Sequence, residues 1–159
     1  MTIQDEILAL AEGWIGTPYR HQGSARGVGC DCLGLVRGIW RALYGTEAEV
    51  VPAYAPDWAE RSGEERLIGA AERHFQAVGS LVEAQAGDLV LFRFRPGMAA
   101  KHAGILARME RGEHTPAAFS QTPDAFIHAY EQSAVIRSAL VPGWRRRIAG
   151  IYRFPERTR

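Results

Sequence analysis

The chain contains two cysteines, Cys30 and Cys32, which are separated by one aspartate, Asp31. A thiol becomes a nucleophile when its thiolate is favoured, and the unpaired N–H groups at the start of a helix supply part of that stabilisation. A helical pattern begins at about Cys32, whereas Cys30 lies two residues earlier in a glycine-rich loop. We therefore predict that Cys32 is the reactive thiol and that Cys30 is a small packing residue.

A nucleophilic thiol also needs a base, and histidine suits this role because its ordinary pKa lies near neutral pH. The chain has five histidines: His21, His74, His102, His114 and His128. His74 flanks the apolar face of a predicted helix and His114 lies in a polar loop, which favours a structural and a solvated histidine respectively. His21 precedes the cysteines, where we predict that it lines a substrate cleft. His102 begins one predicted strand and His128 lies in another, so the two could complete a Cys–His–His triad.

Two other interpretations of these residues stay open. Both cysteines could be buried small hydrophobic residues without any chemistry. Alternatively, four side chains have the right types for a zinc site: Cys30, Cys32, His102 and His128. Structural zinc cysteines usually lie about 2–4 residues apart, however, and one intervening residue makes a poor chelate. A disulfide between such near neighbours would also be strained.

The apolar spacing predicts three helices in the first half of the chain. The first runs from Ile3 to Trp14 after a capping Thr2, and the second runs from about Cys32 to a terminal Gly45. The third follows a capping box at 62–65 and carries apolar residues as far as position 78.

From residue 81 onward the apolar pattern changes to short runs that are typical of strands. The five runs lie within 85–94, 101–108, 126–132, 134–140 and 146–154. They are too closely spaced for helical crossovers, so we expect mostly antiparallel pairing. Helices followed by strands predict an α+β fold, with N-terminal helices packed on a five- or six-stranded sheet.

Length and composition indicate one domain over residues 1–159, because the chain is too short for two ordinary domains and is 47% apolar. The formal net charge of +1, with both signs interspersed, argues against nucleic acid as a partner. No run approaches the ~18 apolar residues of a membrane span. The N-terminus lacks the features of a signal peptide, so we expect synthesis in the cytosol.

Five segments together carry a resemblance to a known family: GTPYRHQG, GCDCLGLVRGIWRALYG, AGDLVLF, KHAGIL and FIHA. In this order they resemble the NlpC/P60 family of cysteine peptidases, which are papain-like hydrolases that cut peptidoglycan stem peptides. The segment DCLGLVRGIWRALYG also resembles the subgroup found with phage tails, prophages and gene-transfer-agent particles. The resemblance implies a papain-like NlpC/P60 fold and no cofactor or metal.

The resemblance also implies roles for individual residues. The family nucleophile falls on Cys32, its base on His102 and its third polar residue on His128. Tyr19 matches a tyrosine that lies close to the nucleophile, and Asp31 matches an aspartate suited to capping the helix or binding a substrate amine. Because family members commonly cleave between D-γ-glutamyl and diaminopimelyl residues, the resemblance implies that bond here.

Two departures from the family bear on context. His102 and His128 lie much farther apart than usual, which indicates an inserted loop at 109–124 that could act as a lid, a specificity loop or a docking surface. The absence of a signal peptide and a wall-binding module favours a catalytic domain that a tail-like particle delivers to the cell wall in the periplasm, with tail proteins as partners. An amidase or acyltransferase on the same fold, and a non-catalytic tail-hub module, are the alternatives.

Overall fold

The computed structural model describes residues 1–51, 54, 64–109 and 122–157. Within them it contains four helices: α1 (Ile3–Trp14), α2 (Cys32–Tyr44), α4 (Arg66–His74) and α5 (Pro142–Arg145). A short antiparallel pair, β1 (Ser24–Ala25) and β2 (Gly29–Cys30), precedes α2. No helix in the described ranges is long and apolar enough to cross a membrane.

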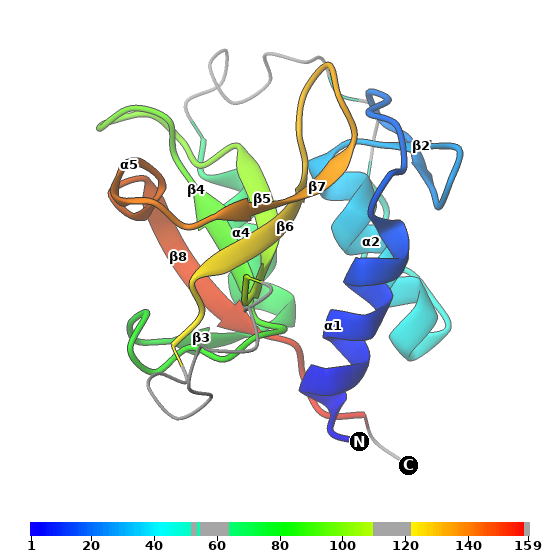
Figure 1. The fold of residues 1–159 in the computed structure, drawn as a ribbon, viewed down its shortest axis with the longest axis horizontal. Coiled ribbons are helices and arrows are strands. Elements are labelled where there is room, and N and C mark those ends of the chain that lie inside the picture. The colour runs from blue at the N-terminus through cyan, green and yellow to red at the C-terminus, as the bar shows by residue number, and fades with distance from the viewer. Residues whose placement is uncertain (52–53, 55–63, 110–121, 158–159) are drawn as a thin grey trace.

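Six further strands form one sheet in the order β3-β8-β4-β5-β6-β7, and every neighbouring pair is antiparallel. They are β3 (Gln76–Val78), β4 (Leu89–Phe92), β5 (His102–Ala107), β6 (Ala125–Ala129), β7 (Val135–Ala139) and β8 (Ile148–Arg153). The prediction of an α+β fold with a mostly antiparallel sheet is therefore confirmed. Figure 1 shows α1 and α2 together on one side of the strands and α5 on the other.

Local capping signals explain the bounds of the first two long helices. Thr2 and Asp5 form a capping box at the start of α1. The side chain of Asp31 caps α2, and Gly45 ends it with a left-handed φ of 79° that glycine adopts at little cost. Both predicted helices thus begin and end where the sequence indicated.

The predicted third helix is wrong at both ends. The helix begins later than the pattern indicated: Glu65 is the N-cap of α4, and its carboxylate accepts a hydrogen bond from the backbone N–H of Ala100 (2.8 Å). The helix ends at His74, and the next residues form β3 against β8. The edge of the sheet offers backbone partners there, and this tertiary pairing overrides the helical pattern. Ser62, the proposed cap, lies outside the described residues.

Alternate residues of the strands pack into two cores on opposite faces of the sheet. On β4, Leu89 and Leu91 join the core under α1, α2 and α4, whereas Val90 and Phe92 join a smaller core on the other face. Trp144 of α5 packs against that smaller core. The prediction of helices on one face therefore holds for the three long helices but not for α5, which the sequence did not indicate.

Candidate active site

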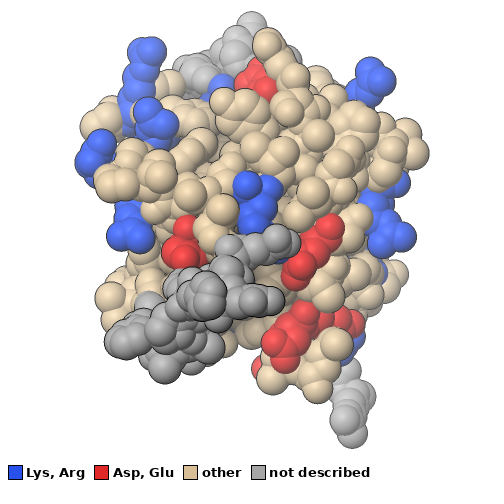
Figure 2. All heavy atoms as spheres, viewed as in Figure 1, with Lys and Arg blue, Asp and Glu red and all other residues tan. Residues whose placement is uncertain are grey.

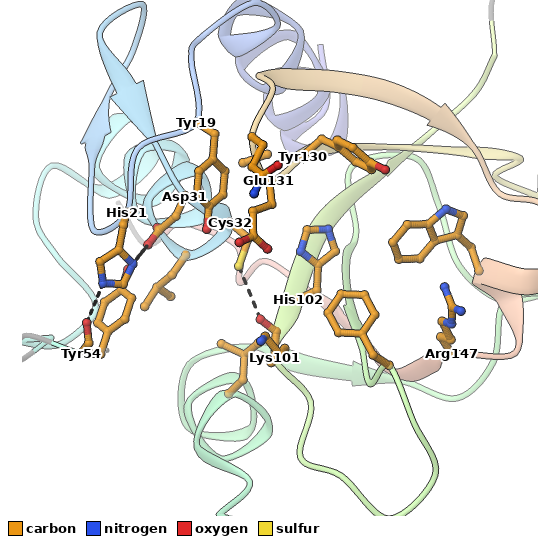
Figure 3. A pocket seen from close by; sticks show the side chains of 16 residues that line it. Tyr19, His21, Asp31, Cys32, Tyr54, Lys101, His102, Tyr130, Glu131 and Arg147 are labelled. Atoms are coloured by element: carbon orange, nitrogen blue, oxygen red, sulfur yellow. Dashed lines mark hydrogen bonds and ion pairs between the residues drawn. The ribbon is translucent and has the colours of Figure 1, made fainter. Parts of the chain in front are cut away.

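The sulfur of Cys32 lies at the junction of α2 and the central strands. Cys32 is the first residue of α2, and its thiol donates a hydrogen bond to the carbonyl oxygen of Lys101, just before β5 (3.6 Å). A cavity of about 560 Å³ opens beside it, and its lining includes Tyr19, His21 and His102. Figure 3 shows the side chain of His102 next to Cys32, facing the same cavity. The N-terminus of a helix, a thiol and an imidazole therefore meet in one pocket.

A chain of hydrogen bonds leads from His102 into the sheet. Its Nε2 lies 2.7 Å from Nδ1 of His128, and Nε2 of His128 lies 2.8 Å from the hydroxyl oxygen of Ser138. His128 is fully buried on β6, and Ser138 lies on the neighbouring β7. The structure thus brings together the three predicted members of the triad and adds Ser138, for which the sequence gave no signal.

Both histidines lie on the face of the sheet opposite to α2. His128 packs against Phe126 and Trp144, at ring-centroid distances of 4.2 and 5.6 Å. His102 is the first residue of β5, and at this end of the strand its ring lines the same pocket as Cys32 at the start of α2. Trp144 also stands 5.8 Å from the His102 ring, and sequence reasoning missed it.

Burial shifts the pKa values of Cys32 and His102. It raises the pKa of the Cys32 thiol to about 12, an effect that the Asp31 charge reinforces and that N–H groups of Ala103 and Leu33 oppose. Burial also lowers the pKa of His102 to about 3, with smaller contributions from His128 and Lys101. The helix terminus was expected to favour a thiolate, but desolvation outweighs it. Both shifts favour a neutral thiol and a neutral imidazole in the resting site.

Tyr19 is fixed beside the pocket by its backbone. Its N–H donates to the carbonyl oxygen of Ser133 (3.0 Å), and the residue forms an isolated β-bridge with Cys30. Burial, followed by the nearby thiol and Asp31, raises the pKa of its phenol. The hydroxyl therefore stays protonated and can donate a hydrogen bond into the cavity.

Asp31 is a buried carboxylate with several donors around it. It accepts hydrogen bonds from the N–H groups of Gly34 (2.8 Å) and Gln22 (2.8 Å), and a short one from the hydroxyl of Tyr54. This confirms its predicted capping role. Nδ1 of His21 lies 3.9 Å from Asp31 and its Nε2 lies 2.7 Å from the carbonyl oxygen of Tyr54. Both residues line the pocket, and their contact with substrate stays a prediction.

The remaining candidates have other places. His74 is bonded to Glu49 (2.7 Å), as expected for a structural histidine, and His114 lies outside the described residues. Cys30 is fully buried in β2 and has a free thiol. Among the described residues, no group of three or more His, Cys, Asp or Glu side chains is arranged to hold a metal ion. Most of the proposed insertion at 109–124 also lies outside the described residues.

Solved structures share this fold. The NlpC/p60 domain of the peptidoglycan hydrolase SagA is 21% identical with a TM-score of 0.55, and the match covers 94% of this chain and 97% of that one. An NLP/P60-family protein similar to a lipoprotein, from Staphylococcus aureus, is 22% identical with a TM-score of 0.57 over 97% of this chain. NlpC2 from Trichomonas vaginalis is 17% identical with a TM-score of 0.59 over 95% of this chain. The chain spans 42% and 46% of the last two.

Two comparisons of the sequence bear on the family of this chain. A comparison with curated protein sequences found no significant match. The model of the NlpC/P60 family, in contrast, matches residues 16–153, a range that includes Tyr19, Cys32, His102, His128 and Ser138. The chain therefore belongs to the NlpC/P60 family.

Proposed function

We propose that this chain is a cysteine peptidase that hydrolyses an amide bond in peptidoglycan stem peptides through a thioester intermediate. One observation carries the proposal: Cys32 begins a helix and shares a pocket with His102, whose far nitrogen is held by His128 (2.7 Å). A positioned thiol, base and orienting group are the minimum for covalent acyl transfer. Membership of a family whose fold includes the peptidoglycan hydrolase SagA supports the substrate class.

The reaction begins from the neutral pair. The proton of the Cys32 thiol passes to Nδ1 of His102, the nitrogen that His128 does not engage, while the sulfur attacks the amide carbon. The backbone N–H of Cys32 and the hydroxyl of Tyr19 are the donors available to the oxygen that becomes negative. Because the first N–H groups of a helix have no partner inside the helix, the first donor is preorganised.

His102 then returns the proton to the leaving nitrogen as the C–N bond breaks, which leaves a thioester on Cys32. In the second half, His102 removes a proton from water and the resulting hydroxide attacks the thioester carbon. The C–S bond breaks, the thiol regains its proton, and the carboxylic acid product leaves. His128 holds the ring of His102 through both steps.

The bond and the biological setting are the finer parts of the proposal. The family resemblance supports cleavage between D-γ-glutamyl and diaminopimelyl residues. The segment that begins at Asp31 and ends at Gly45 resembles the subgroup of tail-like particles, which supports a role as a particle component acting on the cell wall in the periplasm. Mass spectrometry of purified particles from the producing strain would test that setting, and absence of the chain from them would reject it.

Mass spectrometry of muropeptides tests the activity directly. Wild-type protein should release fragments with a new diaminopimelyl amine from purified sacculi, and Cys32→Ala should release none, because no other thiol lines the pocket. Cys30→Ala is the matched control, since Cys30 is buried away from the cavity and its loss should leave the products unchanged. Unchanged release by Cys32→Ala would reject the mechanism, and an inactive wild type with an unreactive thiol would favour a non-catalytic module.

A further inference from the structure

Charged side chains of both signs line the pocket. Asp31 lies on one side of Cys32, and Glu131 also belongs to the lining near the nucleophile (Figure 3). Arg147 lies beyond His102, on the side away from Cys32 (Figure 3). Lys101 also lines the pocket near Cys32, so both signs of charge lie near the nucleophile, whereas Arg147 is the labelled charged residue beyond the base (Figure 3).

The position of Arg147 is fixed by its backbone. Its N–H donates to the carbonyl oxygen of Trp144 (2.9 Å), and its own carbonyl oxygen accepts from the N–H of Arg93 (2.8 Å). The guanidinium carbon lies 5.7 Å from the centroid of the Trp144 ring, which is a cation–π contact. The backbone therefore places the residue, and the contact with the indole favours an orientation of its side chain over the ring.

Trp144 connects Arg147 to the reaction centre. Its ring centroid lies 5.8 Å from that of His102, with an angle of 32° between the ring planes. The guanidinium carbon of Arg147 therefore lies at most about 12 Å from the ring centroid of His102. One or two substrate residues at ~3.5 Å each, together with an ion pair, can cover this distance. Since His102 protonates the leaving amine in the proposed reaction, Arg147 lies on the side of the leaving amino acid.

The guanidinium of Arg147 is available to a ligand. Among the described residues it makes no ion pair, whereas Arg93 is paired with Glu65 (3.1 Å) and Arg145 donates to the carbonyl oxygen of Leu140 (2.9 Å). Figure 2 shows Lys and Arg atoms along the edge of the molecule where α5 lies, so this side attracts anions. A carboxylate matches the planar, two-pronged donor set of an arginine better than any neutral group does.

We propose that Arg147, stacked on Trp144, binds a free carboxylate of the amino acid that departs with the amine product. The enzyme would then select stem peptides that carry an acidic group on the leaving side. This inference deepens the proposed peptidase function and rests on it. Diaminopimelate offers two such groups, the main-chain carboxylate and the one at the end of its side chain.

Three synthetic peptides distinguish these two carboxylates. The first is L-Ala-γ-D-Glu-diaminopimelate with both diaminopimelyl carboxylates free. The second has the main-chain carboxylate amidated, and the third has the side-chain carboxylate amidated. For one of the two amidated peptides, the kcat/KM of wild type should be about tenfold lower than for the free peptide. This is the usual scale for losing an exposed charge-assisted hydrogen-bond pair. That form identifies the carboxylate that Arg147 binds.

Arg147→Gln should lower kcat/KM for the free peptide about tenfold and leave that amidated form unaffected. Arg146→Gln is the matched control, because Arg146 is an exposed neighbour outside the pocket lining and should behave as wild type. Equal losses on all three peptides, or no loss on any, would overturn the proposal.

Peptide affinity, measured by calorimetry, tests the carboxylate site independently of the proposed peptidase activity. In a Cys32→Ala background the free peptide should bind about tenfold more weakly when Arg147→Gln is added, whether or not wild type hydrolyses it. If Arg147→Gln weakens binding but wild type does not cleave the peptide, the peptidase function fails and the carboxylate site stands. If the Cys32→Ala proteins with and without Arg147→Gln bind the peptide equally or not at all, the carboxylate site is rejected.

Discussion

At the scale of single residues, hydrogen bonding decides which nitrogen of His102 serves the thiol. A neutral His102 accepts the thiol proton at Nδ1 only if its Nε2 carries the hydrogen and donates to His128 Nδ1. His128 must then carry its hydrogen on Nε2 and donate to the oxygen of Ser138. The hydroxyl of Ser138 is thus the acceptor that this arrangement of hydrogens requires, although two hydrogen bonds separate it from His102.

Replacing this hydroxyl should weaken catalysis through orientation alone. We expect Ser138→Ala to lower kcat about three- to tenfold with little change in KM, because the substrate does not contact Ser138. The buried N–H of His128 also loses its acceptor, which should lower the free energy of unfolding by about 1–3 kcal/mol. Steady-state kinetics and denaturant unfolding measure the two effects.

Ser138→Thr keeps a hydroxyl and should restore most of kcat, which a purely structural role would not require. Ser133→Ala, at an exposed turn residue, is the control. An unchanged kcat in Ser138→Ala would show that His128 holds His102 without help from β7.

At the scale of elements, the glycine in His-Ala-Gly-Ile allows β5 and β6 to bring their histidines together. Gly104 lies two residues after His102, on the same face of β5. A Cβ added at Gly104 would lie 3.2 Å from Cβ of His128, and 3.0 Å from the carbonyl oxygen of Ile127. Because Gly104 has no side chain, His128 can pack closely against β5, where its ring forms the hydrogen bond to His102.

Gly104→Ala should therefore displace His128 and lengthen its hydrogen bond to His102. We expect kcat to fall about tenfold and the free energy of unfolding to fall by about 1–3 kcal/mol, the usual cost of overpacking a core. Kinetics at matched folded fraction measure the first effect and urea unfolding the second.

Gly143→Ala is a control for glycine replacement, because an added Cβ there meets no atom within 4 Å. Wild-type kinetics in Gly104→Ala would show that the histidine pair tolerates the added methyl group.

At the scale of the whole molecule, burying two neutral histidines makes stability depend on pH. Burial lowers the pKa of His102 to about 3 and that of His128 to about 4, both below the unfolded value of about 6.5. Since the unfolded chain binds protons first as the pH falls, this contribution is complete above about pH 6.5 and is lost progressively toward the folded pKa values.

We expect the free energy of unfolding to fall by up to about 2 kcal/mol for each of these histidines between pH 7.5 and pH 5. Urea unfolding at both pH values measures the change. His128→Gln should remove about half of it, while the contributions of the other titrating groups stay the same in both proteins. An identical pH dependence in wild type and His128→Gln would show that the buried pair does not titrate in this way.

Features that depend on near neighbours in the chain could be predicted before the fold was known. The bounds of α1 and α2, the cap at Asp31 and the position of Cys32 at a helix start follow from periodicity and capping, which act within a few residues. The strand runs of His102 and His128 were also visible, and the family resemblance assigned their roles. This local information was enough to point to the thiol and its base.

Features that depend on strand pairing and burial could not be predicted in this way and became visible in the three-dimensional arrangement. Strand register pairs Ser138 with Phe126, on the face of the sheet that carries His128, and the Ser138 hydroxyl reaches His128 diagonally across the two strands. The fold of the chain after β7 placed Trp144 and Arg147 at the far end of the pocket. The pairing of residues 76–78 with β8 ended a helix that the pattern extended. The neutral state of Cys32 and His102 follows from desolvation, which arises from atoms distant in sequence and so cannot be read from a motif.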